Sequence, residues 1–403
     1  MNPIAITCPQ NVSFVLNRLR ERGHRAYAVG GCIRDTLLGL SPNDWDVTTS
    51  ALPEEILDTF RDKHTIPTGL KHGTVTVMLN KEPIEITTFR IDGAYTDARR
   101  PTSVTFTDRV AEDLSRRDFT VNALAWNENE GIVDCHDGIG DLHRRIIRAV
   151  GVPEVRFSED ALRVLRAYRF SAKLGFEIED STRKALISEA HRLKNISRER
   201  IASEFCRLIT ASHAAKVLRM MEEDGIFPYI FSRDFTLCKD ILDQINVLPS
   251  DDFVYRLAFL LRGHHEGLIR TWLYSLKLSN VQNDAIITLC DTQNLAGAAP
   301  SPYAARALMA KCGAWSLPLL QIAALHGIDT KETSTFVTAA AENGDCVRIA
   351  DLRVNGKDLI AEGLGKGPEI GKLLSALLDA VLHDPALNDR ETLLALAKAL
   401  RNH

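Results

Sequence analysis

A chain of 403 residues is too long for one hydrophobic core and predicts two to four domains. Its composition, 45% hydrophobic and 25% charged, is ordinary for a soluble globular protein, and no apolar run approaches the roughly 18 residues that span a bilayer. The eight cysteines are scattered without a C-x-x-C pair, which favours reduced thiols over disulfides or a zinc site. With no secretion leader at the N-terminus, we expect a cytoplasmic protein.

The charge is unevenly distributed along the chain. The net charge of −4 by itself argues against a nucleic-acid partner, but residues 141–220 hold 17 Lys and Arg against 10 Asp and Glu. A basic middle in an otherwise acidic chain is typical of a zone that contacts a phosphate backbone. For individual residues, a solvated helical surface is the alternative interpretation.

The first predicted elements lead to a glycine turn. A helix over residues 10–22 and a strand over residues 26–29 precede the pair Gly30–Gly31, and a short helix over residues 33–38 follows. Because glycine has no Cβ, a phosphate chain can come close to this backbone. The helix N-terminus favours an anion there, and Arg34 is placed to hold a phosphate oxygen.

Two carboxylates come next, on the second predicted strand. Side chains of a strand alternate between faces, so Asp44 and Asp46 point the same way, about 7 Å apart. Carboxylates at this spacing repel each other unless a cation lies between them. Hard oxygen ligands of this kind suit Mg²⁺, although a lone D-x-D is more often a solvated or capping pair.

The combination of these motifs is far more specific than either one. The pattern G-G-x-x-R-D-x-L-L-G, followed by D-x-D, resembles the class II tRNA nucleotidyltransferase and poly(A) polymerase family. The resemblance implies an α+β fold, in which a nucleotidyltransferase head with a small mixed or antiparallel sheet is followed by all-α segments in an elongated, seahorse-like chain. The implied divisions are the head at 1–142, a neck at 143–211, a body at 212–290 and a tail at 291–403.

A helix and a hairpin complete the predicted sheet. Pro53 in a first turn predicts a helix, and β-branched alternation over 71–78 and 84–89 predicts a β-hairpin. Glu85 on the second hairpin strand is a possible third carboxylate beside Asp44 and Asp46, or equally a structural strand residue. The polar, turn-rich residues 91–103 are expected to form a mobile surface loop, and in the family such a loop is needed to add the terminal adenosine.

The segment from Asp113 to Ala123 matches the family motif R-R-D-F-T-x-N-A. Two adjacent arginines cannot both lie on one helix face, so one of them is expected to reach ligand phosphate or sugar, and we predict that it is Arg117. Asp118 would hold a ribose hydroxyl or brace an arginine, and a structural salt bridge is an equally good interpretation.

The stretch from Ser158 to Gly175 predicts one helix of about 16 residues, with Ser158 as its N-cap. Asp160 and Arg163 are then neighbours on its face, either as a simple ion pair or as a protein template for the base. In the family, this E-D-x-x-R motif recognises C and A, because an aspartate accepts from their exocyclic amino group while an arginine donates to the ring. Arg166 and Arg169 are further candidates for triphosphate or RNA contacts.

The remainder is predicted to be almost wholly helical, with no fixed repeat. His264 and His265 lie where some relatives carry a metal-binding His-Asp pair, but no aspartate follows them here, so we do not expect hydrolase activity. The stretch from Val354 to Asn388 resembles the tail of compact bacterial CCA-adding enzymes. The predicted helices span 198–211, 213–223, 236–247, 251–262, 267–276, 281–293, 301–312, 331–342, 356–362, 367–383 and 389–401.

The resemblance implies template-independent addition of C, C and A to the 3′ end of tRNA from CTP and ATP, with two Mg²⁺ ions held by Asp44 and Asp46. No membrane and no protein partner are implied. The alternatives are a poly(A) polymerase, a CC-only or A-only enzyme, an RNA-binding scaffold with an inactive head, and a small-molecule nucleotidyltransferase. The intact D-x-D and Arg34 speak against the scaffold, and the basic middle speaks against the small-molecule enzyme.

Overall fold

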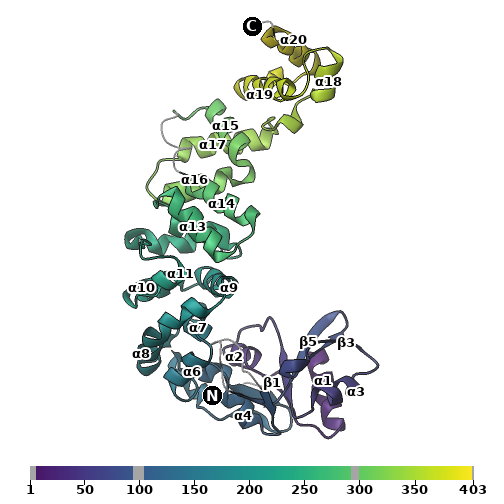
Figure 1. The fold of residues 1–403 in the computed structure, drawn as a ribbon, viewed down its shortest axis with the longest axis vertical. Coiled ribbons are helices and arrows are strands. Elements are labelled where there is room, and N and C mark those ends of the chain that lie inside the picture. Colours follow the sequence, from purple (N-terminus) through teal and green to yellow (C-terminus); the bar gives the residue numbers. More distant parts are fainter. Residues whose placement is uncertain (1–5, 94–103, 292–298, 402–403) are drawn as a thin grey trace. The chain divides into compact units, whose positions relative to one another are not determined.

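The computed structural model describes residues 6–93, 104–291 and 299–401 (Figure 1). It divides into two compact units, one ending at Phe235 and the other beginning at Thr236. The predicted head and neck therefore fall within the first unit, and most of the predicted body and all of the tail within the second. The four predicted divisions themselves stay a prediction.

The first unit begins with a seven-stranded sheet in the order β3-β4-β5-β2-β1-β8-β9. Its strands pair antiparallel except for β2 and β5, which are parallel. The strands are β1 (Ala26–Val29), β2 (Asp46–Thr49), β3 (His64–Gly69), β4 (Thr74–Leu79), β5 (Glu82–Thr88), β8 (Leu124–Asn127) and β9 (Gly131–Asp134). Two small ribbons pair β6 (Arg90–Asp92) with β7 (Val104–Phe106) and β10 (Ile146–Ile147) with β11 (Glu177–Ile178).

Short helices pack on this sheet. They are α1 (Gln10–Glu21), α2 (Gly31–Leu37), α3 (Pro53–Thr59), α4 (Val110–Ser115) and α5 (Gly138–Arg144), with 3₁₀ turns η1 (Leu70–His72) and η2 (Thr120–Asn122). The apolar face of α1 is buried against β1 and β2, and α2 contacts β1 and β8. A core that includes Tyr27, Phe89 and Leu114 fixes the central strands, so the turn between β1 and α2 sits on a rigid base.

Most of the elements predicted for residues 10–89 are confirmed. The β4–β5 hairpin turns at Asn80 and Lys81, both with positive φ (52° and 70°), the backbone that a tight two-residue hairpin turn requires. The strand expected to carry both aspartates begins only at Asp46, so Asp44 precedes it in the loop. The helix after the glycine pair begins at Gly31, two residues earlier than predicted. The proposed loop at 91–103 falls mostly outside the described residues.

Helices make up the rest of the first unit. They are α6 (Pro153–Glu159), α7 (Leu162–Leu174), α8 (Asp180–Glu189), α9 (Arg198–Ile209), α10 (Ala214–Glu223) and α11 (Phe227–Ile230), with η3 (Ala190–Asn195). The single helix expected from Ser158 to Gly175 is wrong. Asp160 is extended (φ −138°) and ends α6, and its carboxylate accepts from the Leu162 amide at the start of α7. An aspartate that caps the following turn competes with helix continuation, which is why the chain breaks there.

The second unit is helical throughout its described part, as predicted. It comprises η4 (Lys239–Val247), α12 (Phe253–Leu261), α13 (Glu266–Leu276), α14 (Asn280–Cys290), α15 (Pro302–Cys312), η5 (Gly313–Trp315), α16 (Ser316–Leu325), α17 (Lys331–Asn343), η6 (Ile349–Asp351), α18 (Gly356–Ala361), α19 (Pro368–His383), η7 (Pro385–Leu387) and α20 (Arg390–Arg401). The helix expected at 236–247 is the 3₁₀ segment η4, and α16 was not predicted. Leu377, Val381 and Leu393 anchor the core of the last helices.

One stretch of this unit, residues 302–325, is long and apolar enough by length and composition to cross a membrane. It is not a continuous α-helix, because Gly313 has φ +56° and ψ −131° and separates α15 from α16. Leu319, Leu320 and Ile322 of α16 are buried inside the unit. Apolar composition of this kind is expected of a core helix in a soluble domain.

Candidate active site

A cleft of about 700 Å³ opens in the first unit between the β1–α2 turn and helices α7 and α9. Polar and charged side chains make up most of its wall, so it suits a charged ligand better than an apolar one. Nine of the predicted site residues line it: Gly30, Gly31, Arg34, Asp44, Asp46, Arg117, Asp118, Arg166 and Arg169. These residues are separated by up to 139 positions in the chain, and the fold brings them to one place.

The acidic pair lies at the start of β2. Asp46 is paired with Val29 of β1, and the parallel register of β2 with β5 sets Val47 beside Ile86, which brings Glu85 next to Asp46. Loss of water in the cleft and the neighbouring charges of Glu85 and Asp44 raise the pKa of Asp46, and Arg117 partly opposes the rise. Carboxylates gathered against their mutual repulsion are the donor set that a divalent cation stabilises, so these residues fit a metal ion.

The glycine turn allows arginines to lie close to the backbone. Gly30 has φ +83°, and a Cβ added there would lie 3.0 Å from Nη1 of Arg117. A Cβ added at Gly31 would lie 3.5 Å from Nη2 of Arg34. Glycine is thus required at position 30 both by its backbone conformation and by the approach of Arg117.

Arg34 and Arg117 form the basic wall next to this turn. Arg34 is buried, pairs with Asp35 at 2.6 Å, donates to the amide oxygen of Asn122 and lies 5.0 Å from the ring centre of Phe170. Arg117 pairs with Asp113 at 3.3 Å, and its buried Nε has no hydrogen-bond partner within the described residues. A buried donor left unpaired is costly, so Arg117 is ready to accept an anionic partner.

Asp118 is held by Arg166. Its Oδ2 accepts from Nε and Nη2 of Arg166 at 2.8 and 2.6 Å, and its Oδ1 accepts from the Phe119 amide and from Asn122. Burial alone would raise the pKa of Asp118, but the charge of Arg166 and these hydrogen bonds outweigh it and lower the pKa. This geometry favours the interpretation that Asp118 braces an arginine. A role at the ribose stays a prediction.

Asp160 and Arg163 are not paired with each other as an exposed helical pair would be. Asp160 pairs with Arg200 at 2.7 Å. Arg163 is buried, pairs with Glu159 at 2.5 Å and donates to the backbone carbonyls of Arg156 and Arg116. Neither is among the described residues that line the cleft. Their role in choosing the base stays a prediction.

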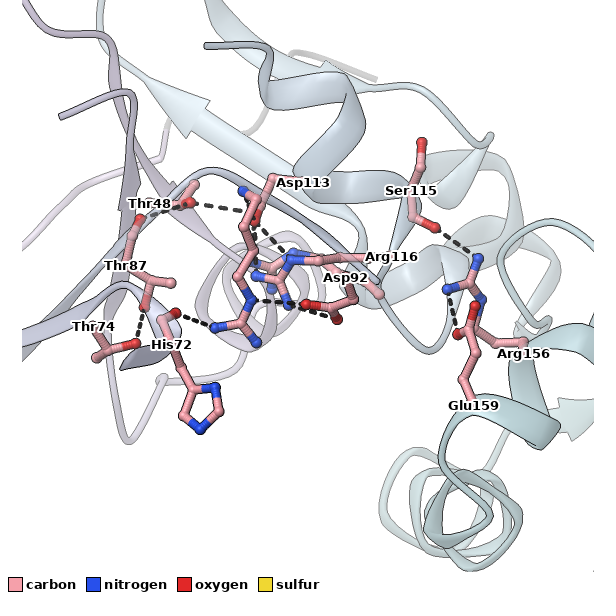
Figure 2. A network of polar contacts seen from close by, with 12 residues as sticks. Thr48, His72, Thr74, Thr87, Asp92, Asp113, Ser115, Arg116, Arg156 and Glu159 are labelled. Atoms are coloured by element: carbon pink, nitrogen blue, oxygen red, sulfur yellow. Dashed lines mark hydrogen bonds and ion pairs between the residues drawn. The ribbon is translucent and has the colours of Figure 1, made fainter. Parts of the chain in front are cut away.

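The partners of Arg163 belong to a polar network beside the cleft (Figure 2). Fully buried Asp113 accepts from Thr48, from Arg116 and from the arginine at the cleft, Arg117. Burial would raise the pKa of Asp113, but the two arginines outweigh it and lower the pKa. Figure 2 also shows Arg156 reaching both Glu159 and the Ser115 carbonyl, so α6 is tied to α4.

Comparisons with known proteins decide the family. Residues 26–148 match the family described as "Poly A polymerase head domain", residues 175–235 match "Probable RNA and SrmB- binding site of polymerase A", and residues 251–397 match domain 2 of tRNA nucleotidyltransferase. The CCA-adding enzyme of Leuconostoc mesenteroides is 36% identical over 394 residues, which cover 96% of each chain. The chain belongs to the CCA-adding enzyme family.

Other CCA-adding enzymes are similar to this chain over nearly its full length. That of Lactobacillus delbrueckii subsp. bulgaricus is 37% identical over 392 residues, covering 93% of this chain and 94% of its own. The crystal structure of the Bacillus stearothermophilus CCA-adding enzyme in complex with CTP matches with a TM-score of 0.84 at 32% identity, covering 98% of both chains. The Thermotoga maritima CCA-adding enzyme complexed with tRNA shares the fold, with a TM-score of 0.67 at 20% identity. The predicted family, fold class and enzyme class are thereby confirmed.

CCA-adding enzymes, like other nucleotidyltransferases of the family, use divalent metal ions. Within the described residues, no group of three or more His, Cys, Asp or Glu side chains is arranged to hold a metal ion. Asp44, Asp46 and Glu85 supply carboxylate oxygens, the donor type that Mg²⁺ sites combine with substrate phosphates.

Sequence reasoning missed part of this enzyme's cleft wall. Asn122 lies within the quoted R-R-D-F-T-x-N-A motif, and Lys173 lies four residues beyond Arg169 on the same helix, so both had a signal. Arg207 lies on α9 and Thr210 directly follows that helix, and no pattern in the sequence connected them to the glycine turn.

His264 and His265 of the second unit act as local hydrogen-bonding groups. The Nδ1 atom of His265 accepts from the Gly267 amide and caps α13, and Nε2 of His264 accepts from the Thr236 amide at 3.2 Å. The expected lack of hydrolase activity stays a prediction.

Proposed function

We propose that this protein adds C, C and A to the 3′ end of tRNA from CTP and ATP and releases pyrophosphate at each step. The observation that carries the proposal is the single cleft in which an acidic pair faces a wall of arginines across a glycine turn. Similarity over nearly the full length to relatives named CCA-adding enzyme supports the same reaction over a poly(A) polymerase or a CC-only or A-only enzyme.

The phosphates of the incoming nucleotide would lie at the glycine turn. The missing Cβ at Gly30 lets Arg117 and the phosphates share this space, and the unpaired Nε of Arg117 gains an acceptor when they arrive. Arg34 adds a second guanidinium, which Asp35 and Asn122 hold in place. Fixed donors of this kind bind a triphosphate without reorganising, which favours in-line attack on the α-phosphorus.

Asp44 and Asp46, with Glu85 as a possible third donor, would hold the metal, which we propose to be two Mg²⁺ ions. When bound, the ions would supply positive charge to the attacking 3′-hydroxyl and to the leaving pyrophosphate. Burial and the charges of Glu85 and Asp44 raise the pKa of Asp46, and a bound cation would relieve the repulsion among these carboxylates.

We further propose that Asp160 and Arg163 choose the base. This role requires their polar groups to be shared between the base and their present partners, Arg200 and Glu159. Arg166 and Arg169 would support it from α7, where they are fixed by Asp118 and Glu204. The protein would act in the cytoplasm, where its tRNA substrate is processed.

The proposal is tested by incubating the purified chain with a tRNA that lacks CCA, with each nucleoside triphosphate separately and with CTP and ATP together, and sequencing the products. Products that end in C-C-A only when both CTP and ATP are present support the proposal. Products that stop after C-C, that extend only a C-C end by A, or that carry a run of A would assign one of the narrower or polymerising activities instead.

A further inference from the structure

Most of the positively charged side chains of the cleft are paired with nearby carboxylates, and Asp35 serves two of them. Six cationic side chains line the described part of the cleft, and five of them have an acidic partner. The pairs are Arg34–Asp35 at 2.6 Å, Lys173–Asp35 at 3.0 Å, Arg117–Asp113 at 3.3 Å, Arg166–Asp118 at 2.6 Å and Arg169–Glu204 at 2.5 Å. These five side chains are therefore already bound to carboxylates of the same chain.

Arg207 is the exception. It lies on the last turn of α9, is exposed, and has no ion pair or side-chain hydrogen bond with the described residues. Its charge is thus uncompensated, and its guanidinium needs to give up only water to bind an anion. A free guanidinium at the edge of a polar cleft matches the forked geometry of a phosphate group.

The position of Arg207 distinguishes between the two substrates whose phosphates could bind it, the nucleoside triphosphate and the RNA strand. Helix α7 lies next to the glycine turn, since Lys173 pairs with Asp35 of α2 and Phe170 lies under Arg34. Helix α9 packs on α7, and among the described residues it has no comparable packing against α2, which begins at that turn. In the proposed function the triphosphate lies at the turn and the acidic pair, whereas Arg207, with Thr210 and Ala211, belongs to the part of the cleft wall supplied by α9 and the residues that follow it.

We infer that Arg207 binds a phosphodiester group of the RNA strand near its 3′ end, and not the triphosphate of the incoming nucleotide. The inference rests on the proposed function, because it needs an RNA 3′ end in the same cleft. Arg207 is a binding residue for the second substrate and takes no part in the bond that forms.

The test compares Arg207→Gln with the wild-type enzyme in steady-state CMP addition to tRNA lacking CCA. We expect the KM for tRNA to rise about tenfold, the KM for CTP to stay within about twofold and kcat to change little, since one charge-assisted contact is lost from one substrate. A plot of the logarithm of the KM for tRNA against the logarithm of the salt concentration should also have a slope smaller by about 0.7. This is the contribution of one phosphate contact on a single strand.

Two further variants make the test specific. Arg207→Lys keeps the charge and should recover part of the affinity for tRNA. Arg233→Gln removes another exposed arginine of the same unit that does not line the cleft, and it should leave both KM values unchanged. Thermal unfolding of each variant should match that of the wild type, because neither side chain is buried.

An increased KM for CTP with an unchanged KM for tRNA would overturn the inference, and so would unchanged values for both. Failure of the proposed function gives a different result, in which the wild-type enzyme itself adds no CMP to tRNA.

Discussion

Replacing Asp118 by asparagine removes the negative charge that anchors Arg166 and keeps the shape of the side chain. Removing one partner of a buried ion pair typically costs about 3–5 kcal/mol. Here Arg166 keeps 32% side-chain exposure and has Glu204 at 3.8 Å as a second acceptor, so we expect a loss of about 2 kcal/mol in the free energy of unfolding at pH 7. The asparagine oxygen can still accept from the Phe119 amide, which limits the loss.

The dependence on pH gives this prediction a definite sign. The pKa of Asp118 is lowered in the folded protein, so its contribution is fully present above the unfolded carboxyl pKa of about 4 and is lost as the pH falls through the folded value. The stability difference between the wild type and Asp118→Asn should be constant between about pH 5 and 8 and should shrink below about pH 4.

Urea unfolding of both proteins across this range measures the difference. Asp62→Asn is the matched control, because Asp62 pairs with Arg18 at 2.5 Å but its side chain is 48% exposed, and little change is expected there. Equal stability of wild type and Asp118→Asn at pH 7 would refute the reasoning that a buried charge pair ties α7 to the head.

Two other predictions concern the glycine turn and the choice of base. Gly30→Ala should cost about 1–3 kcal/mol of stability for a side chain at φ +83°, and should also raise the KM for CTP by displacing Arg117. Gly39→Ala, at φ +72° with no atom near the added Cβ, should show the strain alone, and equal KM values for the two variants would contradict the role of Arg117. Arg163→Ala should relax the choice among the four nucleotides, measured as the ratio of UMP and GMP to CMP incorporation. Continued strong preference for CTP and ATP would place base choice elsewhere.

Local sequence patterns were sufficient to predict the elements whose conformation is determined by neighbouring residues. Alternating β-branched residues around Asn80 and Lys81 predicted the hairpin, because the turn and the strand period agree. The helix break at Asp160 was not predicted, because the residues from Ser158 to Gly175 suit one continuous helix, whereas the aspartate is held by the Leu162 amide and by its tertiary partner Arg200. Helix α16 was missed because apolar residues occur on most of its sides, which hides the helical period.

The site was predictable where one motif supplied several groups. The glycine turn, Arg34 and the acidic pair come from a stretch of 17 residues and meet in the cleft as expected. The hydrogen bonds of Arg163 depend on the backbone carbonyls of Arg156 in α6 and of Arg116, which follows α4. The exposure of Arg207 depends on how α9 packs on α7. Neither follows from residue spacing along one helix.

The central claim is that Asp44 and Asp46 hold the metal that nucleotide addition requires. Single-turnover CMP addition to tRNA lacking CCA tests this claim most directly. The rate is measured over a range of Mg²⁺ concentrations for the wild type, Asp44→Ala, Asp46→Ala and the exposed control Glu54→Gln. The account predicts that each aspartate variant folds normally and loses about 1000-fold or more in rate, which corresponds to about 4 kcal/mol of transition-state stabilisation, while the control keeps full activity. A correctly folded aspartate variant that retains a tenth or more of the wild-type rate would contradict the account.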